Sequence, residues 1–232
     1  MTFSKETQSG NILIYILGAI VLIGILVSLV KGSSTPGSGI DREALEIKVA
    51  EVQQYGNELE RAVAYILRSG YSESDIRFAH PNHSSLYGDI TDDPGRQVFA
   101  REGGGATFRD NDTDIQTTDT DWIFNGRNFV SEVGTSCGDS SCSDLVALLL
   151  NVNIDFCLLV NEKNNLENPS NIPPQDFQTV DYLEFSGSFV AQRQIRSGAT
   201  PEYFSGKTEG CFEGDTDPPA GTYHYYRVIL AR

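Results

Sequence analysis

The strongest constraint on this chain is an apolar segment near its N-terminus. The 19 residues from Ile12 to Val30 contain no charged side chain. A helix needs about 20 such residues to cross a bilayer, whereas the apolar part of a cleavable signal peptide is about 7–15 residues long. No small-x-small cleavage site follows Val30. The sequence therefore predicts a transmembrane or assembly helix over residues 11–31 that is kept in the mature protein.

All the cysteines follow this segment; they are Cys137, Cys142, Cys157 and Cys211. An even number of cysteines after an export-type helix favours disulfides outside the cytoplasm. Of three pairings we favour Cys137–Cys142, which closes a short loop, with Cys157–Cys211, which ties a helix to the C-terminal strands. Four reduced thiols in a cytoplasmic domain are the alternative. The disulfide interpretation makes residues 1–10 a cytoplasmic leader and residues 71–232 extracytoplasmic.

The excess of acidic residues argues against some classes of binding partner. The sequence has 32 acidic and 17 basic residues and a formal net charge of −15, which repels nucleic acid and anionic lipid headgroups. We therefore expect no nucleic-acid partner. We identify no nucleophile and base in a context that supports catalysis, and the glycine run at residues 103–105 lacks the Lys-Ser/Thr of a phosphate-binding loop. We expect no enzymatic activity and identify no cofactor or small-molecule substrate.

A Gly/Ser/Pro hinge at residues 32–39 precedes an amphipathic helix predicted at residues 40–70. Pro36 prevents one continuous helix. Apolar residues then recur in steps of three and four, at Leu45, Val49, Val52, Leu59, Val63 and Ile66. Gly56 leaves one position of this stripe without a side chain, and Gly70 is a good C-terminal stop. The stripe either packs on the chain's own domain, which we favour, or forms a short coiled coil.

Residues 71–232 are predicted to form an acidic α+β domain. Loops and short strands are expected from Tyr71 to Glu132, where Gly, Asp, Asn and Pro are frequent. Asn125-Gly126 stands between two apolar runs, which predicts a type I′ hairpin with strands at Asp121–Phe124 and Arg127–Val130.

Helices and further strands are expected in the second half of this domain. With Ser143 as N-cap, the run "DLVALLLNV" predicts a helix, and Ile154–Asn161 predicts a second one. Strands are predicted at residues 177–185, 188–195 and 222–230. The predicted fold class is thus α+β, with an N-terminal transmembrane helix, a second amphipathic helix, and a mainly antiparallel sheet with two short helices.

One loop has the spacing of a metal site. Asp110, Asp112 and Asp114 alternate like the first ligands of a calcium loop, and Asp121 falls at the twelfth position. Ile115 stands where such loops have glycine, so a solvated acidic loop is the alternative to calcium. The histidines His80, His83 and His224 are interpreted as ordinary, non-ligating residues.

The N-terminal segment has features of helix association. Gly24 and Ser28 lie four residues apart on one helical face, and Gly18 is also small, so a neighbouring helix can approach closely. The polar leader "MTFSKETQSG", the apolar helix, the amphipathic helix and the disulfide domain together resemble a type IV pilin or pseudopilin. The resemblance implies cleavage between Gly10 and Asn11. Tyr15 stands where the family usually has a glutamate.

This resemblance implies a function for the chain. It would be a structural subunit of a bacterial pilus- or pseudopilus-like surface filament, self-associating through its N-terminal helix. The alternative is a single-pass, membrane-anchored periplasmic or surface binding module that does not polymerise. Both interpretations place the chain in the membrane, with its large domain outside the cytoplasm.

Overall fold

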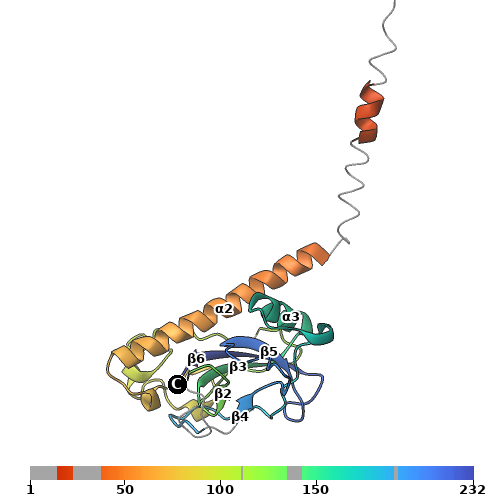
Figure 1. Ribbon diagram of the computed structural model, residues 1–232. Coiled ribbons are helices and arrows are strands. Elements are labelled where there is room, and N and C mark those ends of the chain that lie inside the picture. The colour runs from red at the N-terminus through yellow and green to blue at the C-terminus, as the bar shows by residue number, and fades with distance from the viewer. Residues whose placement is uncertain (1–14, 23–37, 111, 135–142, 191–192) are drawn as a thin grey trace, which may run out of the picture. The chain divides into compact units, whose positions relative to one another are not determined.

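The computed structural model describes residues 15–22, 38–110, 112–134, 143–190 and 193–232 (Figure 1). The chain divides into two compact units, residues 1–47 and residues 48–232. The first unit contains a helix at residues 15–22 and the start of helix α2 (Ser38–Arg68). The second unit, called the sheet domain below, contains the rest of α2, helix α3 and every described strand.

The structure corrects the prediction of a transmembrane helix over residues 11–31. Among the described residues, no helix is long and apolar enough to cross a membrane. The helix at residues 15–22 measures about 12 Å along its axis, whereas the hydrocarbon core of a bilayer is about 30 Å thick. The prediction treated the whole uncharged segment as one helix, and the described helix accounts for only part of it. Residues 11–14 and 23–31 lie outside the described residues.

Helix α2 follows the amphipathic pattern of its sequence. Within the sheet domain its buried face consists of side chains that are at most 8 % exposed: Val49, Val52, Tyr55, Leu59, Ala62, Val63 and Ile66. This stripe packs on the chain's own domain. The helix ends where the Ser69 N–H still bonds to the Tyr65 carbonyl and Gly70 takes a φ of 98°, a conformation that favours glycine.

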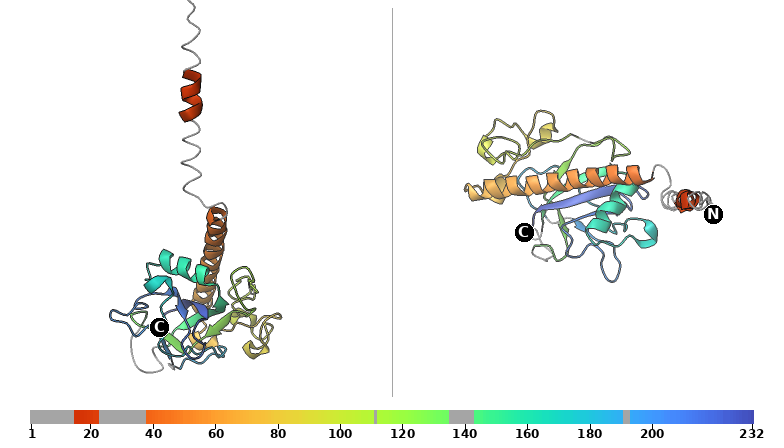
Figure 2. Two further views of the ribbon diagram at one scale, coloured as in Figure 1. Left: turned by 90° about the vertical axis from the view of Figure 1, so that its right-hand side faces the viewer. Right: turned by 90° about the horizontal axis from the view of Figure 1, so that it is seen from above.

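The sheet domain has an α+β fold built on a four-stranded antiparallel sheet in the order β1-β3-β6-β5. Its strands are β1 (Ile123–Asn125), β3 (Leu145–Val152), β5 (Glu209–Glu213) and β6 (Tyr223–Leu230). Helices α2 and α3 (Ile154–Lys163) cover one face (Figures 1 and 2). The other face carries an apolar cluster that includes Val146, Leu148 and Phe212. A two-stranded parallel sheet, β2 (Asn128–Val130) with β4 (Arg193–Ile195), contributes Val130 and Ile195 to this cluster.

Residues 145–152 form the central strand β3, so the helix predicted there is wrong. Val146 and Leu148 belong to the apolar cluster on one face of the sheet, whereas Leu149 faces the α2 side, where it lines a cavity with α2 residues. A strand that is buried on both faces has a continuous apolar run, which sequence periodicity does not distinguish from a buried helix. The second predicted helix is present as α3.

Strands β1 and β2 lie close to the predicted positions, but they do not pair as a hairpin. β1 pairs with β3 and β2 pairs with β4. Asn125 Oδ1 accepts a hydrogen bond from the Arg127 N–H at 2.7 Å. The Asn128 amide exchanges two hydrogen bonds with the Asp181 backbone, at 2.6 and 2.9 Å. These side chains therefore direct the chain from one sheet to the other after the Asn-Gly turn.

The later strands agree with the sequence only in part. Residues 222–230 contain β6, and residues 188–195 end in β4. Residues 177–185 form no strand. Their backbone makes isolated hydrogen bonds to different parts of the domain instead of a ladder with one strand, for example from the Phe185 N–H to the Phe124 carbonyl. Strand β5 was not predicted.

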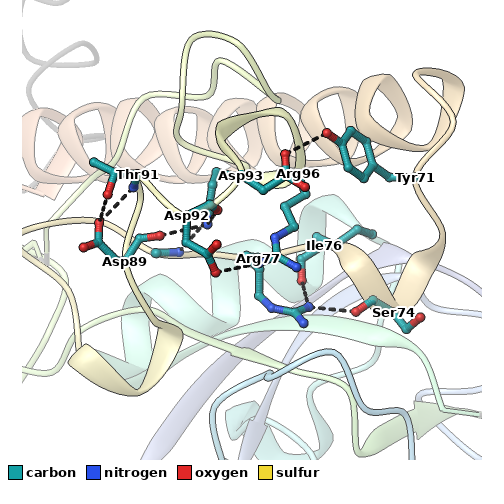
Figure 3. Close-up of polar contacts among 11 residues, drawn as sticks. Tyr71, Ser74, Ile76, Arg77, Asp89, Thr91, Asp92, Asp93 and Arg96 are labelled. Carbon is teal, nitrogen blue, oxygen red and sulfur yellow. Dashed lines mark hydrogen bonds and ion pairs between the residues drawn. The ribbon is translucent and has the colours of Figure 1, made fainter.

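The long segment between α2 and β1 is organised by local polar contacts rather than by strands. Figure 3 shows three of them: Tyr71 donates to Asp93 at 2.8 Å, Arg96 pairs with Asp92 at 2.6 Å, and Thr91 donates to Asp89 at 2.8 Å. In the part of the domain that the structure describes, the 3₁₀ turns are η1 (Glu73–Asp75), η2 (Ser85–Tyr87), η3 (Pro94–Arg96) and, later in the chain, η5 (Pro169–Asn171).

Cys157 and Cys211 form a disulfide that joins α3 to β5. The neighbouring Asn161 side chain reinforces this link, because its Oδ1 accepts from the Cys211 N–H at 2.7 Å and its Nδ2 donates to the Cys211 carbonyl at 3.1 Å. The predicted disulfide of this pair is thus confirmed. Cys137 and Cys142 lie outside the described residues.

A buried cation connects α2 to the sheet. Arg227 of β6 is 12 % exposed and donates to Glu60 at 2.8 Å and to Glu209, itself 4 % exposed, at 2.6 Å. The Tyr225 hydroxyl also donates to Glu209. A side chain at Gly56 would bring its Cβ to 3.2 Å from Arg227 Cγ. The missing side chain in the α2 stripe thus makes room for this arginine.

We predict that Arg227→Met lowers the free energy of unfolding by about 3–5 kcal/mol, because it leaves the buried Glu209 carboxylate without its cation. The measurement is urea unfolding of the full chain. Arg227→Met combined with Glu209→Gln removes the unpaired charge and is expected to recover much of the loss. A single variant as stable as the native chain would contradict this account.

Candidate functional site

The acidic loop at residues 110–121 lies beside α2 and meets a lysine. Lys48 Nζ is 2.9 Å from Asp112 Oδ2 and 3.0 Å from Asp114 Oδ2. The hydrogen bonds to Asp112 and then Asp114 raise the pKa of Lys48. Two of the four predicted calcium ligands therefore converge on one ammonium group. The other two, Asp110 and Asp121, are exposed on the same loop.

Core contacts fix the shape of this loop. Ile115, at the position where calcium loops have glycine, is 1 % exposed and packs inward. The buried Gln116 donates to the Thr120 carbonyl at 2.8 Å and to the Leu150 carbonyl of β3 at 3.0 Å. The loop is thus attached to the central strand. Among the described residues, no three His, Cys, Asp or Glu side chains are grouped so as to hold a metal ion, and calcium binding stays a prediction.

A cavity of about 210 Å³ opens between the loop and α2. Its lining divides into an apolar part and a charged part. The apolar part consists of Val52, Tyr55, Ile115, Trp122 and Leu149, and the charged part consists of Lys48, Glu51, Arg109, Asp110 and Asp112. We call it the Tyr55 cavity. The cavity combines an apolar wall with a charged rim, as small-ligand sites do.

Tyr55 is the central aromatic residue of this wall. It is 1 % exposed, and its ring packs edge-on against Trp122 with centroids 5.2 Å apart. The Arg109 guanidinium lies over the ring, 4.9 Å from its centroid. Burial raises the pKa of Tyr55, and the nearby Arg109 opposes this shift. By distance and angle, the hydroxyl has no hydrogen-bond partner among the described residues.

Arg109 holds its position over Tyr55 through two contacts with α2. Its Nη1 donates to the Glu51 carbonyl at 3.2 Å, and its Nη2 lies 3.7 Å from Glu58 Oε2. The only tryptophan of the sequence, Trp122, continues the aromatic column by packing edge-on against Tyr225 of β6. The cavity wall is therefore continuous with the core on the α2 side of the sheet.

The three histidines occupy two separate environments. His80 and His83 contact the Phe108 ring, and His83 Nε2 lies 2.8 Å from the Trp122 carbonyl. Burial lowers the pKa of His80. His224 is buried in β6, where its Nδ1 accepts from the Asn151 N–H and burial lowers its pKa to about 4.

The remaining predicted site residues belong to the N-terminal region. Gly18 lies in the helix at residues 15–22, and an added Cβ there would meet no atom within 4 Å. Gly10, Asn11, Gly24 and Ser28 lie outside the described residues. The comparisons add no candidate: a scan of protein families, a search of curated proteins and a search of solved structures each found no match to this chain.

Sequence analysis did not select Lys48, Tyr55, Arg109 or Trp122 as site residues. A signal was present for Tyr55, which lies three residues after Val52 on the buried face of α2, and for Trp122, which directly follows the acidic loop. No local pattern brings Lys48 to Asp112, because these residues are 64 positions apart.

We predict that Lys48 acts as the cation of the acidic loop. Replacing it in Lys48→Met should lower the free energy of unfolding by about 1 kcal/mol, since the ion pairs are partly exposed. The variant leaves Asp112 and Asp114 without their common cation, so calcium should raise its melting temperature more than that of the native chain. Thermal unfolding with calcium, and with sodium chloride at equal ionic strength, measures this.

Arg42→Met is the matched control, because it removes an exposed ion pair elsewhere on α2. Its melting temperature should respond to calcium as the native chain does. An unchanged calcium response in Lys48→Met would show that the ammonium and the metal do not share a site.

Asp176 is a buried acid away from the cavity. It is 2 % exposed, its Oδ1 accepts from the Arg196 N–H at 3.0 Å, and burial raises its pKa from 3.8 to about 7. The folded chain therefore binds this proton more tightly than the unfolded chain does. Its contribution to stability is complete below about pH 4 and decreases as the pH rises toward 7.

We predict that Asp176→Asn is more stable than the native chain at pH 8, by roughly 2–4 kcal/mol, and that the difference is small at pH 4. Urea unfolding at both pH values measures this. Asp215→Asn, which changes an exposed acid nearby, should show a much smaller pH dependence. An equal effect of Asp176→Asn at both pH values would contradict the assignment.

Proposed function

We propose that this chain is a structural subunit of a bacterial pilus- or pseudopilus-like surface filament. One arrangement supports the proposal: an apolar segment is followed in the sequence by the long helix α2, whose later part packs along a disulfide-linked antiparallel sheet. This layout resembles that of type IV pilins. In the proposal the sheet domain is the exposed part of the subunit.

Assembly would occur through the apolar N-terminal segment. Copies of this segment bury apolar surface when they pack together, and the small residues Gly18, Gly24 and Ser28 let their backbones approach. The net charge of −15 on the whole chain keeps subunits from associating without order through their exposed surfaces. Self-association would therefore be confined to the apolar segment.

The Tyr55 cavity favours a second candidate function, a periplasmic or surface binding domain that does not polymerise. A cavity with an apolar wall and a charged rim is more typical of ligand binding than of a purely structural subunit. The two functions differ at the N-terminus. A filament subunit is expected to be cleaved between Gly10 and Asn11, whereas the binding domain keeps residues 1–10.

We predict that Gly24→Leu abolishes or strongly reduces filament formation while the sheet domain stays folded, because the larger leucine side chain would keep neighbouring copies of the apolar segment apart. Filaments sheared from the native cells and examined by electron microscopy measure assembly. The control is Leu26→Phe, which adds volume two residues further along the same apolar segment without replacing a small residue. Its filaments should persist.

The intact mass of the sheared material completes the test. A filament subunit should lack residues 1–10 and four hydrogens, the latter for two disulfides. Absence of filaments in the native strain, together with a full-length chain, would reject the filament in favour of the binding domain.

A further inference from the structure

The charged groups at the rim of the Tyr55 cavity are unequally partnered. Lys48 binds two carboxylates, and Arg109 has Glu58, the Glu51 carbonyl and the Tyr55 ring. Both cations of the rim are thus engaged within the chain.

The carboxylates of the rim have fewer partners. Glu51, with a side chain 52 % exposed, has only a 3.9 Å contact with Lys48. Asp110 is exposed and interacts electrostatically with His80, whose pKa is lowered by burial. The charge left to attract a ligand is therefore negative, in a chain whose net charge is already −15.

The inner wall of the cavity limits the chemical type and the size of the rest of a cationic ligand. Val52, Ile115, Trp122 and Leu149 are each at most 8 % exposed, so the wall offers apolar contact. The volume of about 210 Å³ is below the roughly 300–1,000 Å³ of pockets for drug-sized molecules. A group the size of one side chain is the appropriate occupant.

A buried polar atom adds an independent indication of a ligand. The Tyr55 hydroxyl belongs to a residue of the wall that is 1 % exposed, and it has no hydrogen-bond partner among the described residues. A buried hydroxyl without a partner is costly. An ammonium group supplies up to three N–H donors, which suit the Tyr55 oxygen and the carboxylates of Asp110 and Glu51.

We propose that the Tyr55 cavity binds an alkylammonium group, with its alkyl chain on the apolar wall and its charge between Asp110 and Glu51. The group belongs either to a small free amine or to a lysine side chain of another protein. This binding is independent of filament formation, because every residue of the cavity belongs to the sheet domain.

Trp122 makes the test direct, because it is the only tryptophan of the chain and lines the cavity. Its fluorescence, excited selectively, is followed while the full chain is titrated with n-butylammonium at constant ionic strength. A saturable change is expected, and n-butanol, which has the same alkyl chain without the charge, should produce none. Nα-acetyl-lysine methylamide tests the second source, and a saturable change with it would assign the site to lysine side chains as well.

Two variants locate the site. Asp110→Asn should weaken n-butylammonium binding roughly fivefold, the effect of losing one exposed charge pair. Asp119→Asn changes an exposed acid of the same loop that does not line the cavity, and it should leave binding unchanged. Three results would each overturn the proposal. These are no saturable response to n-butylammonium and none to Nα-acetyl-lysine methylamide, a response to n-butanol equal to that to n-butylammonium, or equal binding of n-butylammonium by Asp110→Asn and the native chain.

Discussion

The fold of the sheet domain depends on how one arginine is kept out of water. The Arg227 guanidinium is buried between β6 and α2, and burial without carboxylates would be prohibitive. Its partners come from two elements, Glu209 on β5 and Glu60 on α2, so the ion pairs restrict where α2 can lie. Gly56 supplies the space, because any side chain there would compete with Arg227. Hydrophobic burial drives α2 onto the sheet, and the arginine selects its register.

The geometry of the Tyr55 cavity follows from this register. Tyr55 is adjacent to Gly56, so fixing the helix at Arg227 also fixes the Tyr55 ring against Trp122. Lys48 lies about two turns earlier on the helix and reaches Asp112 of the acidic loop. The loop in turn is attached to β3 through Gln116. The cavity is therefore built from rigid elements on two sides, which favours a fixed arrangement of its charges.

The sequence predicted what local patterns determine. The 3.6-residue periodicity placed α2, and α3, β6 and the Cys157–Cys211 disulfide were also found. Prediction from the sequence failed for the elements whose structure depends on contacts with distant parts of the chain. The run at residues 145–152 is apolar on both sides, so its period is uninformative, and burial between two layers makes it a strand. The turn at Asn125-Gly126 leads between two sheets because Asn128 and Asp181 bond to each other across 53 residues. The ion pair of Lys48 with the acidic loop was not predicted for the same reason, because Lys48 and Asp112 are 64 positions apart in the sequence.

The contacts of Asn161 with Cys211 have a consequence for how copies of this chain can meet. β5 is the last strand of its sheet, and the Asn161 side-chain amide both accepts from the N–H of Cys211 and donates to its carbonyl. An amide used in this way imitates the next strand. At the end of β5 the backbone around Gln175 covers the edge in its turn: the Glu213 N–H donates to the Pro174 carbonyl at 2.9 Å, and the Glu213 carbonyl accepts from the Asp176 N–H at 2.8 Å. A free strand edge invites pairing with another chain and uncontrolled aggregation. At these positions the edge is closed by the chain itself and is not available for strand pairing with another copy.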